Sequence, residues 1–252
     1  MFQKIRWGAL LFSILLIAGC KTYYSPAGAP APRLIQINDQ LGSDTAIVNY
    51  LAPYKARLDK EMNVVIGETV TDLTRQYTAH ETTMGNFFSD ALLSIGQELD
   101  PAVQISFATK GGIRADVPKG PMTVSNMFEV MPFENYVVVL TITGSQFLKM
   151  LDHIVRAGGQ PVAGMTLTLT NTTCEDVMVQ GKPFDPSKNY TIVTYDYLAD
   201  GGDGVEYFRN PVKFEKYNLL MRDGLINYVK AKTAKGEKIN VHIDNRIKDA
   251  RK

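Results

Sequence analysis

The sequence predicts an α/β or α+β fold, because segments with the apolar spacing of helices alternate with short segments rich in β-branched residues. Residues 136–143, YVVVLTIT, have the composition of a strand. After Gly144, residues 145–157, SQFLKMLDHIVRA, have the pattern of an amphipathic helix. The predicted strands are short and irregularly spaced, which argues against a barrel.

Helical spacing of apolar residues also occurs earlier and later in the chain. Residues 44–60 and 84–99 repeat apolar side chains every three or four positions, and residues 217–232 are predicted to form the last helix. Residues 123–131 are predicted to form a short helix with Thr123 as its N-cap, since a threonine hydroxyl can accept an N–H of the first turn.

The other predicted strands are short. Residues 64–70 are rich in β-branched side chains, and residues 103–109 alternate in polarity. Further strands are expected at 165–171, 190–195 and 239–243.

The size and composition are those of one globular domain with a small extension. The chain has 252 residues, of which 45% are hydrophobic and 21% are charged. The formal net charge is +1, so no overall basic field attracts nucleic acid. We therefore expect no nucleic-acid polymer as a partner.

The N-terminus has the features of a bacterial lipoprotein export signal. Lys4 and Arg6 precede an apolar segment at 8–19 that is too short to span a membrane comfortably. The motif 16-LIAGC-20 resembles a lipobox, which predicts removal of residues 1–19 and acylation of Cys20. The protein is then exported and lipid-anchored to a bacterial membrane, facing the periplasm. A simple signal anchor with a chance cysteine is the alternative.

The rest of the chain divides into four segments by composition and pattern. Residues 20–32, rich in proline, glycine and alanine, are predicted to be a flexible tether. Residues 33–62 are a helical extension that either caps the domain or contacts a partner. Residues 63–232 form the main domain, and residues 233–252 carry a terminal strand and a charged tail. Cys174, the other cysteine, is expected to be an inert thiol.

The sequence contains no recognisable catalytic machinery. His80, His153 and His242 are the three histidines, and none has the spacing of a metal-ligand pair. A phosphate-binding P-loop and a nucleophile elbow are both absent from the sequence. We interpret the histidines as structural or solvated, and we expect no metal ligands in this chain.

Three loops nevertheless carry residues suited to binding a polar ligand. In 110-KGGIRADVPKG-120, Gly111 and Gly112 allow close approach of the backbone, and Arg114 offers a planar fork for an anion. A tight turn with Arg114 in a salt bridge is the alternative. In 199-ADGGDGVEYF-208, Asp203 lies in a strained, exposed turn. It is suited to accepting two vicinal hydroxyls, to binding calcium, or to satisfying its own turn amides.

Together these motifs resemble the C-terminal domain of the bacterial and animal 5'-nucleotidases. The resemblance is carried by 81-ETTMGNFFSDALL-93, 111-GGIRADVPKGPMTVSNMFEVMPFEN-135, 140-LTITGSQFLKMLD-152 and 197-YLADGGDGVEYF-208. It covers roughly residues 64–215 and implies a layered α/β (α+β) domain, with helices outside mixed β-sheets.

The resemblance also implies a role for each matching residue. Phe133 and Tyr197 match the two aromatics that sandwich the base, although the family usually has phenylalanine at the second position. Asp203 matches the acid that holds the ribose hydroxyls, and Arg114 matches an arginine near the phosphate. Asn135 matches a pocket asparagine of some members.

The sequence departs from the family at the edge of this site. Thr109 stands where the family has an asparagine that reaches the base, and Lys110 stands where it has a glycine. An arginine expected shortly before Glu81 is missing, with Thr78 near that position. We expect Lys110 to be the group that supplies the lost charge, although a lysine is no bidentate fork.

The family also has a metallophosphatase domain before this one, holding two metal ions and the catalytic residues. The segment between Cys20 and residue 64 is too short for such a domain. We therefore expect no catalysis by this chain alone. One hypothesis is a split 5'-nucleotidase, in which a separate metallophosphatase subunit carries two divalent ions. The other is a stand-alone nucleoside- or nucleotide-binding lipoprotein, and a descendant with an unused pocket also stays open.

Overall fold

The computed structural model describes residue 34 and residues 36–38, 41–76 and 80–250. The predicted signal peptide, the predicted tether, Cys20 and Thr78 lie outside these residues. The chain divides into two compact units, residues 1–49 and 50–252. Helix α2 (Thr45–Met62) begins in the first unit and ends in the second, and none of its residues is buried. Among the described residues, no helix has the length and apolarity needed to cross a bilayer.

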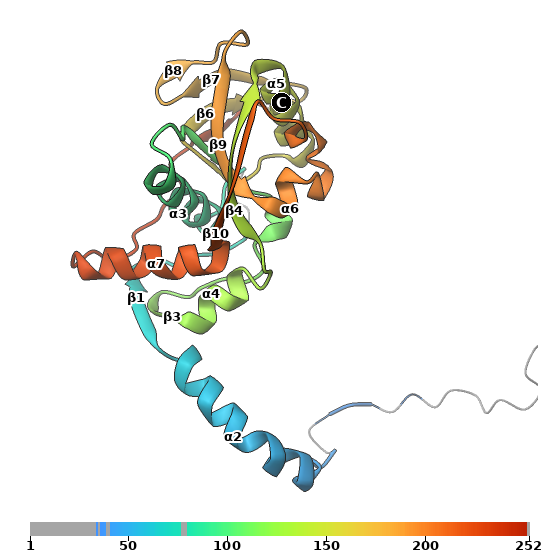
Figure 1. Ribbon diagram of the computed structural model, residues 1–252, viewed down its shortest axis with the longest axis vertical. Coiled ribbons are helices and arrows are strands. Elements are labelled where there is room, and N and C mark those ends of the chain that lie inside the picture. Colours follow the sequence, from blue (N-terminus) through green and yellow to red (C-terminus); the bar gives the residue numbers. More distant parts are fainter. Residues whose placement is uncertain (1–33, 35, 39–40, 77–79, 251–252) are drawn as a thin grey trace, which may run out of the picture. The chain divides into compact units, whose positions relative to one another are not determined.

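A five-stranded mixed sheet forms the centre of the second unit (Figure 1). Its strands run in the order β10-β4-β9-β2-β5, and only the β2–β9 pair is parallel. Their bounds are β2 (Ile105–Phe107), β4 (Tyr136–Thr143), β5 (Val162–Ala163), β9 (Asn189–Tyr195) and β10 (Lys213–Leu220). The β-branched strand β9 pairs with β4 along its whole length, from Asn189 with Thr143 to Tyr195 with Val137, and the two strands lie inside the sheet.

Helices α3 (Thr83–Leu99) and α5 (Gly144–Ala157) cover opposite faces of this sheet. Ser106 of β2 donates a hydrogen bond to the carbonyl of Ser89 on α3, while the neighbouring Phe107 contacts His153 on α5. Successive strand residues point to opposite faces, so the two contacts place one helix on each side. A capping box of Thr143 and Gln146 begins α5, where a threonine hydroxyl accepts a backbone N–H.

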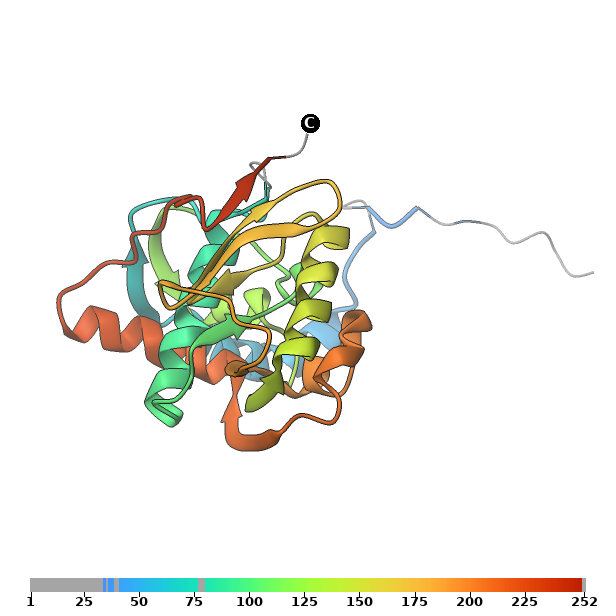
Figure 2. The same ribbon diagram turned by 90° about the horizontal axis from the view of Figure 1, so that it is seen from above.

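A second mixed sheet has the strand order β11-β6-β7-β8. Its strands are β6 (Met165–Leu169), β7 (Cys174–Val179), β8 (Lys182–Pro183) and β11 (Ile247–Asp249). Figure 2 shows β11 in dark red beside β6, with which it pairs in parallel. Helix α5 contacts both sheets, because Phe147 stacks on Phe184 after β8 and contacts Tyr190 on β9. The layered α/β (α+β) prediction with mixed sheets is therefore confirmed.

A two-stranded antiparallel sheet and two helices complete the second unit. They are β1 (Val65–Thr69), β3 (Gly120–Thr123), α4 (Val124–Val130) and α7 (Met221–Ala234). Gly67 of β1 lies so close to Val229 of α7 that a side chain there would collide with it. As predicted, Thr123 caps α4, and its hydroxyl and the Asn126 side chain form a capping box. Short helical turns α6 (Asp196–Ala199), η1 (Lys110–Gly112), η2 (Gly202–Gly204) and η3 (Glu206–Phe208) lie in the loops.

Two predicted elements near the C-terminus are wrong in position. The helix expected from residue 217 begins at Met221, because residues 217–220 continue β10 along β4. The strand expected at 239–243 is absent from those residues, which contribute only an isolated bridge at Ile239. The terminal strand is β11, at Ile247–Asp249. Sheet partners far along the chain decide both positions, and local composition does not show them.

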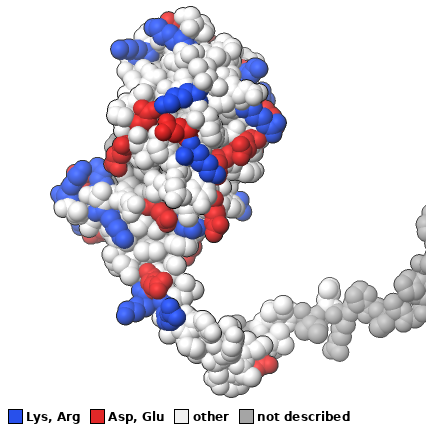
Figure 3. Space-filling model, viewed as in Figure 1, with Lys and Arg blue, Asp and Glu red and all other residues white. Residues whose placement is uncertain are grey.

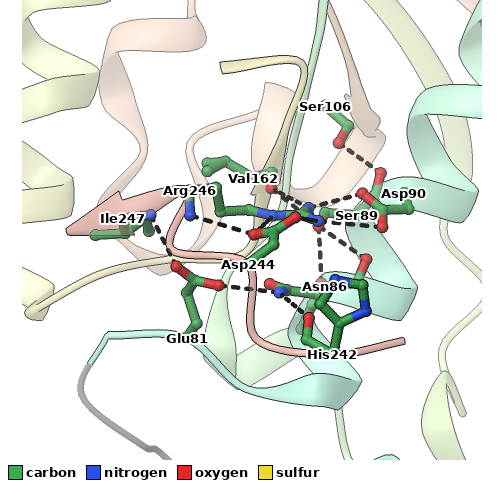
Figure 4. A network of polar contacts seen from close by, with 11 residues as sticks. Glu81, Asn86, Ser89, Asp90, Ser106, Val162, His242, Asp244, Arg246 and Ile247 are labelled. Atoms are coloured by element: carbon green, nitrogen blue, oxygen red, sulfur yellow. Dashed lines mark hydrogen bonds and ion pairs between the residues drawn. The ribbon is translucent and has the colours of Figure 1, made fainter. Parts of the chain in front are cut away.

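The C-terminal segment is fastened to the start of α3 by buried polar groups (Figure 4). Glu81 accepts the backbone N–H of Ile247 at 2.9 Å through one carboxylate oxygen. Through the other oxygen it accepts the side-chain amide of Asn86 at 3.0 Å. Asn86 also donates to the carbonyl of His242 at 3.1 Å. Glu81 and Asn86, both in the matching stretch 81–93, therefore bind the C-terminal segment.

Arg246 is the centre of the same network. Its guanidinium pairs with Asp90 on α3 and with Asp244, each at 2.7 Å, and donates to the carbonyl of Val162 at 3.0 Å. Burial acts to raise the pKa of Asp244, but the hydrogen bonds and charge of Arg246 outweigh burial and hold this pKa below its usual range. The charged tail is thus held against α3 at this point by a partly buried arginine.

Candidate functional site

A cleft of about 290 Å³ opens where the loops after β2, before β4 and after β9 come together. It is lined by Gly111, Gly112, Arg114, Phe133, Asn135, Tyr195, Tyr197 and Asp203. The structure thus brings all seven residues of the predicted ligand site into one cleft. A more open depression of about 430 Å³ lies elsewhere, beside Asp90, Asp244 and Arg246, whose charges pair with one another.

The two glycines of the predicted loop make room for other groups of the site. A Cβ atom on Gly111 would lie 3.3 Å from Oδ2 of Asp203. A Cβ atom on Gly112 would collide with the hydroxyl of Tyr195. The glycines therefore let the loop pack directly against β9 and the turn after it.

The two aromatic residues of the site are exposed at the cleft. Phe133 is 40% exposed and Tyr197 is 49% exposed, so neither side chain is used to fill the core. Asp196 connects the segments that carry them. Its Oδ1 atom accepts the backbone N–H groups of Tyr136, at 3.0 Å, and of Tyr197, at 2.9 Å. One carboxylate oxygen thereby connects the start of β4, which follows Phe133, with the start of α6, which carries Tyr197.

Asp203 adopts a left-handed backbone conformation, with φ 52° and ψ 24°, which is uncommon for a residue other than glycine. Its Oδ2 atom accepts the hydroxyl of Thr109 at 2.5 Å, and its Oδ1 atom accepts the hydroxyl of Tyr197 at 3.0 Å. Within the described part of the chain, hydroxyl groups and not turn amides are its hydrogen-bond donors. No group of three or more His, Cys, Asp or Glu in that part could hold a metal ion.

The turn that carries Asp203 is braced by Arg209. The guanidinium donates to the carbonyl of Asp200 at 3.0 Å and pairs with Glu206 at 2.6 Å. Gly201, at φ 95°, has no room for a side chain beside this guanidinium. The G-G-D-G run is thus a fixed turn.

Arg114 is the cation of the cleft. Its guanidinium donates one hydrogen bond of 3.3 Å to the carbonyl of Gly111, and its Cζ atom lies 6.0 Å from the centre of the Phe133 ring. Among the described residues it has no carboxylate within ion-pair distance, so the alternative of a salt-bridged turn does not hold. Arg114 therefore has N–H groups with which to bind an anion.

Lys110 does not replace the missing cation of the cleft, which corrects the expectation from the sequence. Its ammonium group donates to the carbonyls of Ala157, at 2.8 Å, and of Gly158, at 3.3 Å. It does not line the cleft. The C-terminal carbonyls of α5 attract this lysine, as helix ends attract cations generally.

Sequence reasoning missed three residues that shape the site: Thr109 as a hydrogen-bond donor, Tyr195 as a lining residue and Asp196 as a brace. Burial raises the pKa of Tyr195 to about 12, so its hydroxyl stays protonated at neutral pH. The hydroxyl lies 3.5 Å from that of Thr109. The one signal in the sequence was the position of these residues at the ends of predicted strands, beside the motifs.

Charges of both signs are interspersed on the surface shown in Figure 3. The cleft itself combines two exposed aromatics, a carboxylate and a guanidinium. A model of the family described as 5'-nucleotidase, C-terminal domain, matches residues 65–210. The chain belongs to this family.

The relatives include proteins named as an apyrase and as 5'-nucleotidases. An apyrase of Tabanus yao is 30% identical over 81% of this chain and 41% of its own length. Protein UshA of Escherichia coli is 24% identical over 75% of this chain and 35% of its own length. The chain thus spans less than half the length of these relatives.

Solved structures show the same fold. The 5'-nucleotidase precursor of Thermus thermophilus superposes with a TM-score of 0.67 at 23% identity, over 81% of this chain and 42% of that chain. The NAD nucleotidase of Haemophilus influenzae gives a TM-score of 0.63 at 18% identity, over 83% and 42%.

Proposed function

We propose that this chain binds a nucleoside or nucleotide in the cleft and is the binding half of a split extracytoplasmic 5'-nucleotidase. The observation that carries the proposal is the convergence of two exposed aromatics, one carboxylate and one guanidinium in a single cleft. In this proposal a separate metallophosphatase chain supplies two divalent metal ions, and acylated Cys20 anchors the protein to a bacterial membrane, facing the periplasm.

Each ligand group has a chemically matched partner in the cleft. The base stacks between Phe133 and Tyr197, where stacking contributes about 1–3 kcal/mol per base. The ribose hydroxyls donate to Asp203, whose carboxylate has lone pairs beyond those that its two hydroxyl donors use. A phosphate accepts N–H groups of Arg114, whose planar fork suits its oxygens.

The role in hydrolysis is to bind and orient the substrate. A phosphomonoester held beside a metal-activated water reacts faster because its reacting group is already placed. The residues of the cleft hold the nucleoside, so the phosphate extends past Arg114 toward the partner's metal ions. We expect this chain to leave nucleotides intact when it is alone.

A stand-alone binding lipoprotein is the second candidate. One observation favours it: this chain by itself brings the aromatics, the carboxylate and the guanidinium together in one cleft. The two proposals agree on the ligand and differ on the partner.

Hydrolysis assays and a pull-down separate the two proposals. Purified residues 21–252 with Mn²⁺, Zn²⁺ or Co²⁺ should release no phosphate from AMP, and the Tyr197→Ala variant controls for contaminants. Capture from native membranes should recover a metallophosphatase that restores hydrolysis. Metal-dependent turnover by the wild-type chain alone, lost in Tyr197→Ala, would contradict the proposal that a separate chain carries out catalysis. Recovery of no metallophosphatase would favour the stand-alone protein.

A further inference from the structure

Thr109 differs in its hydrogen bonding from the other threonines that precede helices in this fold. Thr82, Thr123 and Thr143 stand directly before helices, and each uses its hydroxyl to accept an N–H of the first turn. Thr109 stands in the same position before η1, with the same extended backbone, but makes no such bond. The residue is only 2% exposed, so we expect its hydroxyl to have another partner inside the protein.

That partner is the carboxylate of Asp203, and it fixes the direction of the hydrogen bonds. The Thr109 hydroxyl donates its single proton to Oδ2 of Asp203. The Thr109 oxygen is then free to accept from the Tyr195 hydroxyl, 3.5 Å away. The pKa of Tyr195, raised to about 12 by burial, keeps that donor protonated. The result is a buried chain of donors that ends on the carboxylate.

The glycines of the neighbouring loop are arranged around this chain of hydrogen bonds. Gly112 leaves the space that the Tyr195 hydroxyl occupies, and Gly111 leaves space beside Oδ2 of Asp203. Thr109 does not itself line the cleft, whereas Asp203 and Tyr195 do. Thr109 therefore acts on a ligand only through Asp203.

We propose that Thr109, supported by Tyr195, is a positioning residue that holds the Asp203 carboxylate in the orientation that receives the hydroxyls of a ribose. This inference rests on the proposed nucleoside site. The backbone of Asp203 lies in the left-handed region, where aspartate is tolerated but residues other than glycine are uncommon, so the direction of its side chain is set by an unusual backbone and by its hydrogen-bond partners. Thr109 restrains one oxygen and Tyr197 the other.

The test compares two variants and two ligands in the chain of residues 21–252. Thr109→Val keeps the shape and removes the hydroxyl, and Thr109→Ser restores the hydroxyl. Calorimetry with adenosine and 2′,3′-dideoxyadenosine then reports whether the effect depends on the ribose hydroxyls. We expect Thr109→Val to weaken adenosine about tenfold, to leave the dideoxy ligand unchanged, and to be rescued by Thr109→Ser. Equal loss for both ligands, or no loss, would overturn the inference.

Hydrogen exchange of residues 200–205 gives a second readout that needs no ligand. The turn should exchange faster in Thr109→Val than in the wild type, and Thr109→Ser should restore the wild-type rate. If the wild type binds no adenosine, the proposed function fails, and exchange still decides whether Thr109 restrains Asp203. If Thr109→Val does not fold, Tyr195→Phe is the milder variant, and a wild-type exchange rate and affinity for it would overturn the role of Tyr195.

Discussion

The ammonium group of Lys110 donates a hydrogen bond to the carbonyl oxygen of Ala157 at 2.8 Å, at the C-terminal end of α5. The lysine therefore serves the helix end and not the cleft, although it lies in the loop that carries Gly111 and Gly112. Arg114 is the cation left to meet a ligand phosphate.

Phosphate recognition should depend on Arg114 and not on Lys110. We expect Arg114→Ala to reduce AMP affinity about tenfold while adenosine affinity stays unchanged, because only AMP presents an anion to the guanidinium. Lys110→Ala is the matched control in the same loop and should leave the ratio of the two affinities at its wild-type value. Calorimetry with both ligands checks this. A changed ratio in Lys110→Ala would show that the lysine reaches the phosphate.

Asp196 should be needed for both stability and binding. Asp196→Ala leaves the backbone N–H groups of Tyr136 and Tyr197 without their acceptor, which should cost about 1–3 kcal/mol of unfolding free energy. Nucleoside affinity should fall as well, because the two sides of the cleft lose their connection. Chemical denaturation and calorimetry measure the two effects.

Lys216→Ala is the control for that variant. It removes the ion pair that Lys216 makes with Oδ2 of Asp196 and the contact of its ammonium group with the Tyr136 ring, and it leaves the backbone acceptor Oδ1 in place. We expect nearly wild-type stability and affinity, since exposed ion pairs contribute little. Equal effects of the two substitutions would mean that the ion pair, and not the backbone acceptor, is what matters.

The contribution of the ion pair between Arg246 and Asp244 to the unfolding free energy should decrease in acid. The pKa of Asp244 is lower in the folded protein than its ordinary value of 3.8, so the carboxylate stabilises the fold above that pH. The stabilisation is lost as the pH falls through the lower, folded-state pKa. The difference in unfolding free energy between wild type and Asp244→Asn should therefore be largest near neutral pH and shrink below about pH 4. Denaturation curves from pH 7 to pH 3 test this, and a difference that is independent of pH would refute it.

Cys174 should be unreactive in the folded protein. Burial, with the nearby charge of Asp152, raises the pKa of its thiol to about 12, and only the thiolate reacts with alkylating agents. In residues 21–252 we expect no modification by iodoacetamide at pH 8 and complete modification in denaturant, measured by mass spectrometry. Rapid labelling of the native protein would show that the thiol is accessible.

Local signals predicted some elements closely. Strand β4 occupies the predicted residues 136–143, because its β-branched composition and its central place in the sheet agree. Helix α5 begins one residue before the predicted start, where Thr143 and Gln146 form the capping box. Strands β10 and β11 could not be placed in the same way. Their charged sequences form strands through partners more than 60 residues away along the chain, as in the pairs of Lys213 with Thr141 and Ile247 with Leu167.

The residues of the candidate site were also predicted only in part. The motifs identified seven of the residues that line the cleft, because glycines, an exposed aromatic and a turn aspartate have distinctive local patterns. The residues whose hydroxyl groups lie beside Asp203 inside the protein were not identified. Thr109 and Tyr195 are ordinary strand-end residues until the fold places their hydroxyls beside Asp203. Lys110 was misassigned for a similar reason, since only the fold shows that α5 ends next to it.

The central claim is that the cleft between Phe133 and Tyr197 binds a nucleoside. The most direct measurement is a calorimetric titration of residues 21–252 with adenosine and AMP. The wild type should bind both saturably, and Tyr197→Ala should abolish binding. Phe214→Ala, which removes an aromatic of similar exposure outside the cleft, should bind like the wild type. Absence of saturable binding by the wild type, or undiminished binding by Tyr197→Ala, would contradict the account.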